Sequence, residues 1–379
     1  MILSGMLREL KRLYASKMDL FMVTIAPLAL IILFGSMFLA SSAHHLPIAV
    51  VDRDQTLLSQ KIIQDLSLNE TLDVTLVTTQ RNEAELQLNK NEIWGYVIIP
   101  PQAEQRLVKA QDAQIAVIYN QSYFSIGSAI SSAMTSTITT AILSYLTENH
   151  YQQLIPKLNG HALPSIKIST LFNPDMSYEF YLEPLLLPAM LHLMLCCCVA
   201  FSIGREFLEN SVSDWSQGSP WQALLAKNLV FIFIFMFWTA LWMFWLTQIR
   251  GWFIAGSVWF LLLGQFCFYF AYALISSFFV IGTKSSEKTF DLLAVYGGSS
   301  LSFAGVTLPI TINTPLFTQI WASIIPYTSY MKLQIQQWDI GSPLSVSFLQ
   351  LKILLIFCIL FFVLSGLMLK KYLNKENLT

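Results

Sequence analysis

The side chains that could do chemistry gather in one short polar segment, residues 204–228, between two long apolar runs. Arg205 and Glu209 lie four residues apart, the spacing that places opposite charges on one face of a helix. A serine and then Pro220 indicate the start of a second helix, which continues through Lys227. The chemistry available here is ion pairing. We therefore predict a compact helix-turn-helix that either transmits a push from a soluble partner or is a plain solvated connector.

Two further ionisable groups lie well inside an apolar run. Glu183 and His192 are nine residues apart in the run 180–203. Ionisable groups at membrane depth usually face a bundle interior or a substrate pathway. We assign both residues to a candidate substrate path, with a position at the membrane interface as the alternative for Glu183. The chain contains no Gly-x-x-x-x-Gly-Lys-Ser/Thr loop, so we do not expect it to hydrolyse ATP itself.

Neither the histidines nor the cysteines predict a metal or redox centre. His44 and His45 are adjacent, which is a poor geometry for shared ligation. All five cysteines fall in apolar runs, and the consecutive residues Cys196, Cys197 and Cys198 point in different directions on a helix. We expect these cysteines to serve helix packing. No metal and no cofactor are predicted on this chain.

The composition is that of an integral membrane protein. Of 379 residues, 55% are apolar and 12% are charged, with a mean hydropathy of +0.56, whereas about a quarter of a soluble protein is charged. Charge is segregated, because 21 of the 45 Asp, Glu, Lys and Arg residues fall in residues 42–179. We predict that this segment is a soluble domain and that the rest of the chain spans a lipid membrane. Nothing in the sequence suggests nucleic-acid binding.

The apolar runs predict a six-helix transmembrane bundle with both ends of the chain in the cytoplasm. Each span needs about 20 apolar residues, and Lys and Arg concentrate in cytoplasmic loops. Residues 1–19 combine helically spaced leucines with a basic face, which predicts an amphipathic helix on the membrane surface. Prolines interrupt residues 310–349, where we expect a re-entrant or interfacial hairpin on the outer side. The predicted spans are residues 20–41, 180–203, 229–249, 253–281, 292–309 and 350–369, with a cytoplasmic tail at 370–379.

Strand patterns alternate with helix patterns in residues 42–179, which predicts an extracytoplasmic α/β domain with a mixed or parallel sheet. Residues 126–146 carry no charge, yet nine of them are Ser or Thr, and apolar residues recur there at every fourth position. Such a stripe predicts a long helix of the soluble domain, as a stalk or a dimer face, rather than a further span. The expected strands are residues 47–52, 72–77, 93–100, 114–120 and 163–172, and the shorter helices are 56–68, 82–91 and 102–110.

Three stretches together resemble the permease subunits of ABC type-2 exporters, especially the branch with a large extracytoplasmic domain that includes bacterial multidrug-type exporters. The resemblance covers the whole membrane region. The chain departs from the family pattern at Asn210 and Ser211, where the family has glycine and threonine, and at Ser213, where the family has glutamate. The stretches are Arg8-Glu9-Leu10 with Asp19 and Pro27, Gly204-Arg205-Glu206 with Pro220 and Lys227, and LSFAGVTLP at 301–309 followed by IIPYTSY at 324–330.

This resemblance implies an exporter in the bacterial inner membrane that moves a drug, a lipid or a similar amphiphile outward. A second permease chain would complete the pathway, and a separate ATP-binding subunit would hold ATP and magnesium. The extracytoplasmic domain would gate substrate or meet a periplasmic membrane-fusion adaptor. Glu206 and Glu209 would make charge contacts to the ATPase, and Arg205 would hold the helix that carries them. The residues predicted to couple the permease to the ATPase are Arg8, Glu9, Arg205, Glu206, Glu209 and Lys227.

Two other classes of protein compete with an exporter. A membrane-anchored receptor or assembly protein would act through residues 42–179, but anchoring needs one or two spans rather than six. A secondary carrier needs a series of buried charges near the membrane midplane, and the predicted spans lack such a series. A neighbouring gene that encodes an ATPase would favour the exporter over the receptor.

Overall fold

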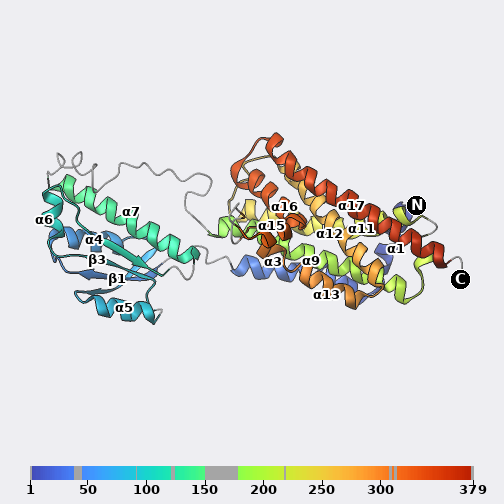
Figure 1. The fold of residues 1–379 in the computed structure, drawn as a ribbon, viewed down its shortest axis with the longest axis horizontal. Coiled ribbons are helices and arrows are strands. Elements are labelled where there is room, and N and C mark those ends of the chain that lie inside the picture. The colour runs from blue at the N-terminus through green and yellow to red at the C-terminus, as the bar shows by residue number, and fades with distance from the viewer. Residues whose placement is uncertain are drawn as a thin grey trace. The chain divides into compact units, whose positions relative to one another are not determined.

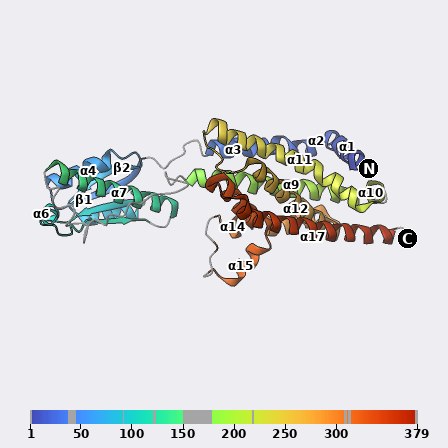
Figure 2. The same ribbon diagram turned by 90° about the horizontal axis from the view of Figure 1, so that it is seen from above.

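The computed structural model describes residues 2–37, 45–90, 92–120, 124–149, 178–216, 219–306, 310 and 314–376. The chain divides into two compact units (Figures 1 and 2). One unit comprises Met1–Leu39 together with Phe180–Thr379 and is helical, and the other comprises Ala40–Glu179 and contains the sheet. The predicted strand at 163–172 and His44 lie outside the described residues.

Within the described part of the chain, five helices are long and apolar enough to cross a membrane. They overlap five of the six predicted spans, in order along the sequence. The structure is therefore that of a multi-pass membrane protein with a small separate sheet unit. The five helices are Lys17–Met37, Glu179–Leu208, Pro220–Ile249, Val258–Thr283 and Leu344–Lys375.

Two of these helices form the centre of the helical unit. In the most apolar windows of Glu179–Leu208 and Val258–Thr283, 72% and 61% of the residues are buried, against 22% in the first candidate span and 28% in the last. An apolar helix that is buried on most sides is a core helix, and one that exposes its apolar side chains can face lipid. The helices are α1 (Ile2–Ala15), α2 (Lys17–Val23), α3 (Ile25–Met37), α9 (Tyr178–Leu208), α10 (Val212–Ser216), α11 (Pro220–Phe244), α12 (Val258–Thr283) and α17 (Leu344–Glu376).

The structure corrects the predicted span at 292–309. Helix α13 (Ser286–Tyr296) ends before two consecutive glycines, and α14 (Ser300–Phe303) follows as a single turn. A Cβ atom at Gly297 would lie only 2.7 Å from Leu193 Cδ2 of α9. Glycine weakens a helix by about 1 kcal/mol relative to alanine, and here it also permits the close approach of α9. Apolarity alone therefore predicted a continuous helix where the described residues form two shorter helices on either side of a glycine pair.

The segment predicted as an outer hairpin at 310–349 contains α15 (Leu316–Ser323) and α16 (Pro326–Ile335), followed by a π-helical turn at Gln336–Ile340. Most of α16 is buried, including the rings of Tyr327 and Tyr330. This helix packs against α12 and α17. It is thus part of the core of the bundle, which fits the re-entrant alternative of the prediction rather than the interfacial one.

The second unit has the strand and helix order that the sequence predicts for residues 45–120. Its four strands lie in the order β2-β1-β3-β4, with β1 parallel to both neighbours and β3 antiparallel to β4, so the sheet is mixed. Strand β1 is buried on both faces, which explains its unbroken apolar sequence. The elements are β1 (Leu46–Asp52), α4 (Leu57–Ser67), β2 (Leu72–Thr78), α5 (Arg81–Asn89), β3 (Gly95–Ile99), α6 (Ala103–Val108), β4 (Ala116–Tyr119) and α7 (Phe124–Glu148).

The uncharged segment 126–146 forms α7, a long helix of this second unit, as predicted. Its apolar stripe does not form a stalk or a dimer face. Ile130, Met134 and Ile138 are buried in the core beside α4 and one face of the sheet, while α5 covers the other face (Figure 1). The described Ser and Thr side chains of α7 from Ser131 to Thr147 lie on its more exposed sides.

Candidate functional site

A group of charged residues is buried where α1, α9 and α11 meet. Lys227 of α11 lies at its centre, and its Nζ contacts Glu9 Oε2 of α1 at 2.9 Å and Glu206 Oε1 of α9 at 3.0 Å. Nζ also donates to the Ser202 hydroxyl at 2.9 Å. The lysine and both carboxylates are at most 2% exposed. A buried charge is tolerated only when it is paired and hydrogen-bonded, and each of these three groups meets that condition.

Glu206 connects this centre to two arginines of α1. Arg12 Nη1 lies 2.5 Å from Glu206 Oε1, and Arg8 Nη2 lies 3.4 Å from Glu206 Oε2. The Ser211 hydroxyl donates to the same carboxylate at 2.5 Å. One fully buried carboxylate is thus held by cations from α1 and α11 together. We call Arg8, Glu9, Arg12, Ser202, Glu206 and Lys227 the buried charge cluster.

Further ion pairs surround the buried charge cluster. Arg12 Nη2 reaches Glu209 at 3.3 Å, and Arg205 Nη1 pairs with Asp19 of α2 at 2.7 Å. Arg8 Nη1 donates to the backbone carbonyl of Asp214 at 2.8 Å. Because these contacts come from α1 and α2 on one side and from α9 and α10 on the other, they join the N-terminal helices to the polar segment between α9 and α11.

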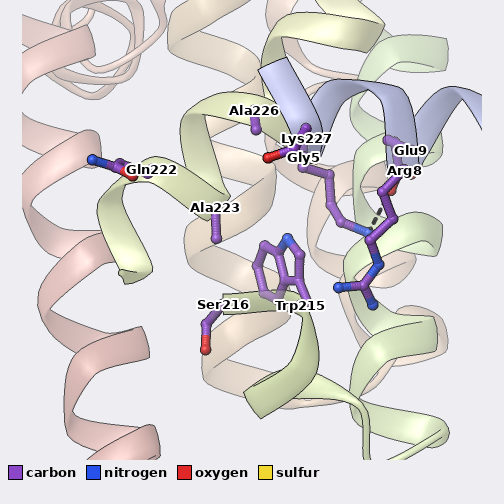
Figure 3. A pocket seen from close by; sticks show the side chains of 10 residues that line it. Gly5, Arg8, Glu9, Trp215, Ser216, Gln222, Ala223, Ala226 and Lys227 are labelled. Carbon is purple, nitrogen blue, oxygen red and sulfur yellow. Dashed lines mark ion pairs between the residues drawn. The ribbon is translucent and has the colours of Figure 1, made fainter. Parts of the chain in front are cut away.

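A small cavity of about 60 Å³ lies beside the buried charge cluster, between α1, α10 and α11 (Figure 3). Figure 3 shows Lys227 extending to Glu9 past Arg8, with the Trp215 ring close by. Lys227 Nζ lies 5.2 Å from the centre of that ring, so a cation–π contact adds to the ion pairs. The cavity is roughly twice the ~30 Å³ that one water takes up in the liquid, which is too small for an organic substrate.

Helix α1 faces the protein in a way that the sequence did not predict. Its basic residues Arg8 and Arg12 point towards α9 rather than towards a membrane surface. Its exposed side carries Leu3, Leu7 and Tyr14 together with Lys11. The helix is amphipathic as predicted, but two of its basic residues form ion pairs within the chain, and its exposed leucines are available to lipid.

The turn after α9 explains how the chain tolerates its departure from the family pattern. Asn210 has φ = +52°, the left-handed conformation that glycine usually adopts at a helix end and that asparagine accepts. Ser211 supplies a hydroxyl to Glu206, a contact that threonine could also make. The pair Asn210 and Ser211 therefore keeps both the backbone conformation and the hydroxyl that glycine and threonine would provide.

Comparison with known protein families identifies the chain. It matches the family of ABC-2 family transporter proteins over residues 17–367, which is nearly its whole length. The chain is an ABC-2 family transporter protein. Comparison with curated proteins and with solved structures gave no match. Membership of this family makes the chain a multi-pass permease subunit of an ABC transporter, with an ABC ATPase as its general class of partner, and decides against a receptor that is merely anchored.

All six coupling residues predicted for this ABC-2 permease meet in one place, but their pairing differs from the prediction. Arg205 pairs with Asp19 rather than with Glu209, which lies four residues further along the chain, just after α9 ends. Glu206 is fully buried, so it does not present its charge to a partner as predicted and instead positions α9 against α1 and α11. The prediction missed the central role of Arg12, although its four-residue spacing from Arg8 places both on one face of α1.

The two residues predicted for a substrate path are not brought together in this ABC-2 permease. Glu183 is fully buried near the start of α9 and pairs with Arg250 at 3.3 Å. His192 is also buried, with its ring 4.2 Å from the centre of Tyr272 and 5.5 Å from that of Phe268. The two residues therefore lie in different parts of the helical unit and have different neighbours.

Proposed function

We propose that this permease subunit exports a hydrophobic or amphipathic substrate, such as a drug or a lipid, outward across the bacterial inner membrane, and that a separate ATP-binding subunit drives it. The observation that carries this proposal is an exposed tip, residues 208–214, braced from within by the buried charge cluster. Leu208 is 84% exposed at the end of α9. Such a side chain is suited to enter a pocket on a partner.

The chemistry of the tip defines the partner surface that would fit it. Glu209 and Asp214 are exposed on either side of the turn, and Leu208 projects beside them. A complementary surface would hold an apolar pocket for Leu208 and basic residues for the two carboxylates. We propose that the ATP-binding subunit presents that surface, with Glu209 making direct charge contact and Glu206 acting as a positioning residue behind it.

The buried charge cluster gives the tip a mechanical connection to the membrane helices. Glu206 and Ser202 belong to α9, the helix that leads into the tip, and they are tied to α1 through Glu9 and to α11 through Lys227. A push on the tip would therefore move α1, α9 and α11 as one body. This arrangement suits a subunit that converts closure of a partner ATPase into helix movement.

We place the tip, α1 and the C-terminus together on the cytoplasmic side. Phe207 of α9 packs on Tyr372 near the end of α17, with ring centres 5.1 Å apart. Lys284, in the turn between α12 and α13, lies 4.7 Å from the same Tyr372 ring. This end of the helical unit collects Arg8, Arg12 and further lysines, and the bias of basic residues towards the cytoplasm supports the assignment.

The rest of the transport path follows from this orientation as part of the same proposal. The second unit would then lie outside the membrane, where it would gate substrate or meet a periplasmic adaptor. A second permease chain, identical or related, would complete the pathway. Glu183 and His192 would meet substrate only when α9 moves, because both are packed within the chain. Unchanged transport by Glu183→Gln across several substrates would exclude Glu183 from the path.

The proposal is tested by purifying the full chain in mild detergent from its native membrane and identifying copurifying proteins by mass spectrometry. We expect an ATP-binding subunit in about equal amount with the native chain, and its loss with Leu208→Asp. The matched control is Leu68→Asp, because Leu68 is similarly exposed, at 74%, but lies in the sheet unit. Retention of the ATP-binding subunit by Leu208→Asp, or its absence from the native chain, would contradict the proposal.

A further inference from the structure

Helix α16 continues directly into the π-helical turn Gln336–Ile340, which we call η3. Gln337 and Trp338 of η3 are fully buried, and the turn packs against α12 as well as against α16. π-helical turns are rare in proteins and often occur at functional sites. The side chains of η3 are therefore candidates for a role beyond packing.

The turn η3 holds the residues that lead from α11 into α12. The Ala255 N–H donates to the Trp338 carbonyl at 3.0 Å, and the Gly256 N–H donates to the Gln337 carbonyl at 2.8 Å. The Ser257 N–H donates to Gln337 Oε1 at 2.9 Å. A Cβ atom at Gly256 would lie 2.5 Å from the same Oε1, so glycine permits this close approach. We call these three hydrogen bonds between η3 and residues 255–257 the η3 junction.

Asp339 adjoins the η3 junction and lacks the partners that a buried carboxylate normally has. Its side chain is partly buried, and its Oδ1 atom is buried with no hydrogen-bond partner among the described residues. Asp339 also lies in the last turn of the helix formed by α16 and η3, where the helix dipole disfavours a negative charge. Burying a charge is costly unless it is paired and hydrogen-bonded. The neutral, protonated form of Asp339 is therefore favoured.

The charged residues of the neighbouring elements do not offset this cost. Lys332 of α16 and Lys352 of α17 are exposed, and Arg250, which precedes the η3 junction, pairs with Glu183 at 3.3 Å. Helix α12 contains no charged residue. Burial alone raises the pKa of Asp339 to about 7, without a contribution from a neighbouring charge. The other titratable residues of α12 and α16 are of types that are ordinarily neutral near pH 7, namely Cys267, Tyr269, Tyr272, Tyr327 and Tyr330.

We propose that Asp339 is a proton-binding site and that its proton keeps the η3 junction closed. With the proton bound, the carboxylic acid is neutral and can itself donate a hydrogen bond. When the proton leaves, a charge without a partner remains next to the buried Trp338. Conformations in which the carboxylate reaches water then become favoured, and these require η3 to move away from residues 255–257. The η3 junction is thus tightest at acidic pH and loosens as the pH rises.

Closing the η3 junction raises the affinity of Asp339 for a proton. The closed form therefore holds a proton between about pH 4 and pH 7 that the open form releases. Because of this difference, the free energy that favours the closed form falls as the pH rises through that window and is constant above it. Between pH 6 and pH 8 the opening equilibrium should shift by about tenfold towards the open form.

This property belongs to the chain alone and needs no ATP-binding subunit. Only the assignment of the η3 junction to the outer side of the membrane rests on the proposed function, because the junction and the tip belong to opposite ends of the helical unit in that proposal. On the outer side, the proton on Asp339 would make this end of the bundle respond to the pH outside the cell.

The test is hydrogen exchange of the full chain, purified in mild detergent, at pH 6 and pH 8, with each rate corrected for its intrinsic pH dependence. We expect the protection of peptides that contain residues 255–257 to fall about tenfold at pH 8. Asp339→Asn cannot ionise and should show equal protection at both pH values. Asp291→Asn, at an exposed aspartate of α13, is the matched control and should keep the native pH dependence.

An internal reference and a second variant make the result decisive. Peptides around Glu206, at the other end of α9, should have the same corrected protection at both pH values. Asp339→Leu replaces Asp339→Asn if that variant does not fold. The proposal is overturned by unchanged protection of residues 255–257 in the native chain, or by a pH dependence that persists in a folded variant without the carboxylate. Because no partner is present, failure of the docking proposal leaves this test unaffected.

Discussion

The two ends of α9 each bury a carboxylate, but they hold it in different ways. Glu206 and Glu183 are separated by 23 residues, or roughly 35 Å at 1.5 Å per helical residue. Glu206 is held by cations from α1 and α11 and by a hydroxyl from the following turn. Glu183 forms an ion pair with Arg250, which lies in the turn between α11 and α12. The first end is fixed by several helices, whereas the second depends on a connecting turn.

The backbone shows the same contrast as the ion pairs. At the end that carries Glu206, α9 is regular, and Gly204 lets α13 pack directly against it. At the end that carries Glu183, two prolines lie inside the helix, Pro184 and Pro188, and α11 finishes in a π-helical turn. Internal prolines remove helix hydrogen bonds, and π turns often mark functional sites. We infer that α9 is rigid at the end that carries Glu206, where we propose that the ATPase acts, and more easily deformed at the other end.

The largest effect is expected from removing the centre of the buried charge cluster. Lys227→Met leaves Glu9 and Glu206 without their shared cation, and breaking a buried ion pair typically costs about 3–5 kcal/mol. Thermal unfolding of the purified chain in detergent measures the loss. Lys288→Met, at an exposed lysine, is the control and should change stability little. A Lys227→Met variant as stable as this control would show that the cluster does not fix this end of α9.

A smaller effect is expected where α9 and α13 touch. A Cβ atom at position 204 would lie 2.0 Å from Ser286 Oγ and 3.1 Å from Ser286 Cβ, so Gly204→Ala displaces the Ser286 hydroxyl from its hydrogen bond to the Ala200 carbonyl and crowds the contact between the two helices. Overpacking of this kind costs about 1–3 kcal/mol. Ser286→Gly removes the clashing atoms and should restore part of the stability when combined with Gly204→Ala. If the two substitutions are simply additive in thermal unfolding, the close contact does not set the packing of these helices.

At the other end of α9, the structure predicts a loss of about 1–3 kcal/mol when a side chain that replaces a helix hydrogen bond is removed. Pro188 has no N–H for the Pro184 carbonyl, and Gln334 Nε2 of α16 donates to that oxygen at 2.6 Å. Gln334→Leu should leave the carbonyl unsatisfied. Hydrogen exchange should rise in the first turns of α9 and stay unchanged around Glu206. Equal rates of amide hydrogen exchange at both ends of α9 would show that the two ends do not differ in rigidity.

The smallest effect on stability is expected at the surface of the cluster. Glu209 is about half exposed, so its pair with Arg12 should contribute less than about 1 kcal/mol. Glu209→Gln should therefore unfold at nearly the native temperature while weakening copurification of the ATP-binding subunit. A large stability loss with unchanged copurification would assign Glu209 to folding rather than to docking.

Local patterns in the sequence predicted the sheet unit well, because its signals are short in range. Alternating strand and helix patterns fix β1 to β4 and their helices, and the four-residue repeat identifies α7. The ion pairs could not be predicted in this way. Arg12 and Glu206 are 194 residues apart in sequence, and only the packing of α1 on α9 brings them together. The sequence shows which charged residues are present, but it does not show which of them pair in the folded chain.

The most direct test of the rigid, partner-facing end of α9 is site-specific photo-crosslinking in the native membrane. A photoreactive amino acid replaces Leu208 in one variant and Leu68 of the sheet unit, which is 74% exposed, in the other. Mass spectrometry then identifies what each position captures. We predict that position 208 captures an ATP-binding subunit and that position 68 does not. Capture of that subunit from position 68 alone, or from neither position while the complex is intact, would contradict the role of the tip.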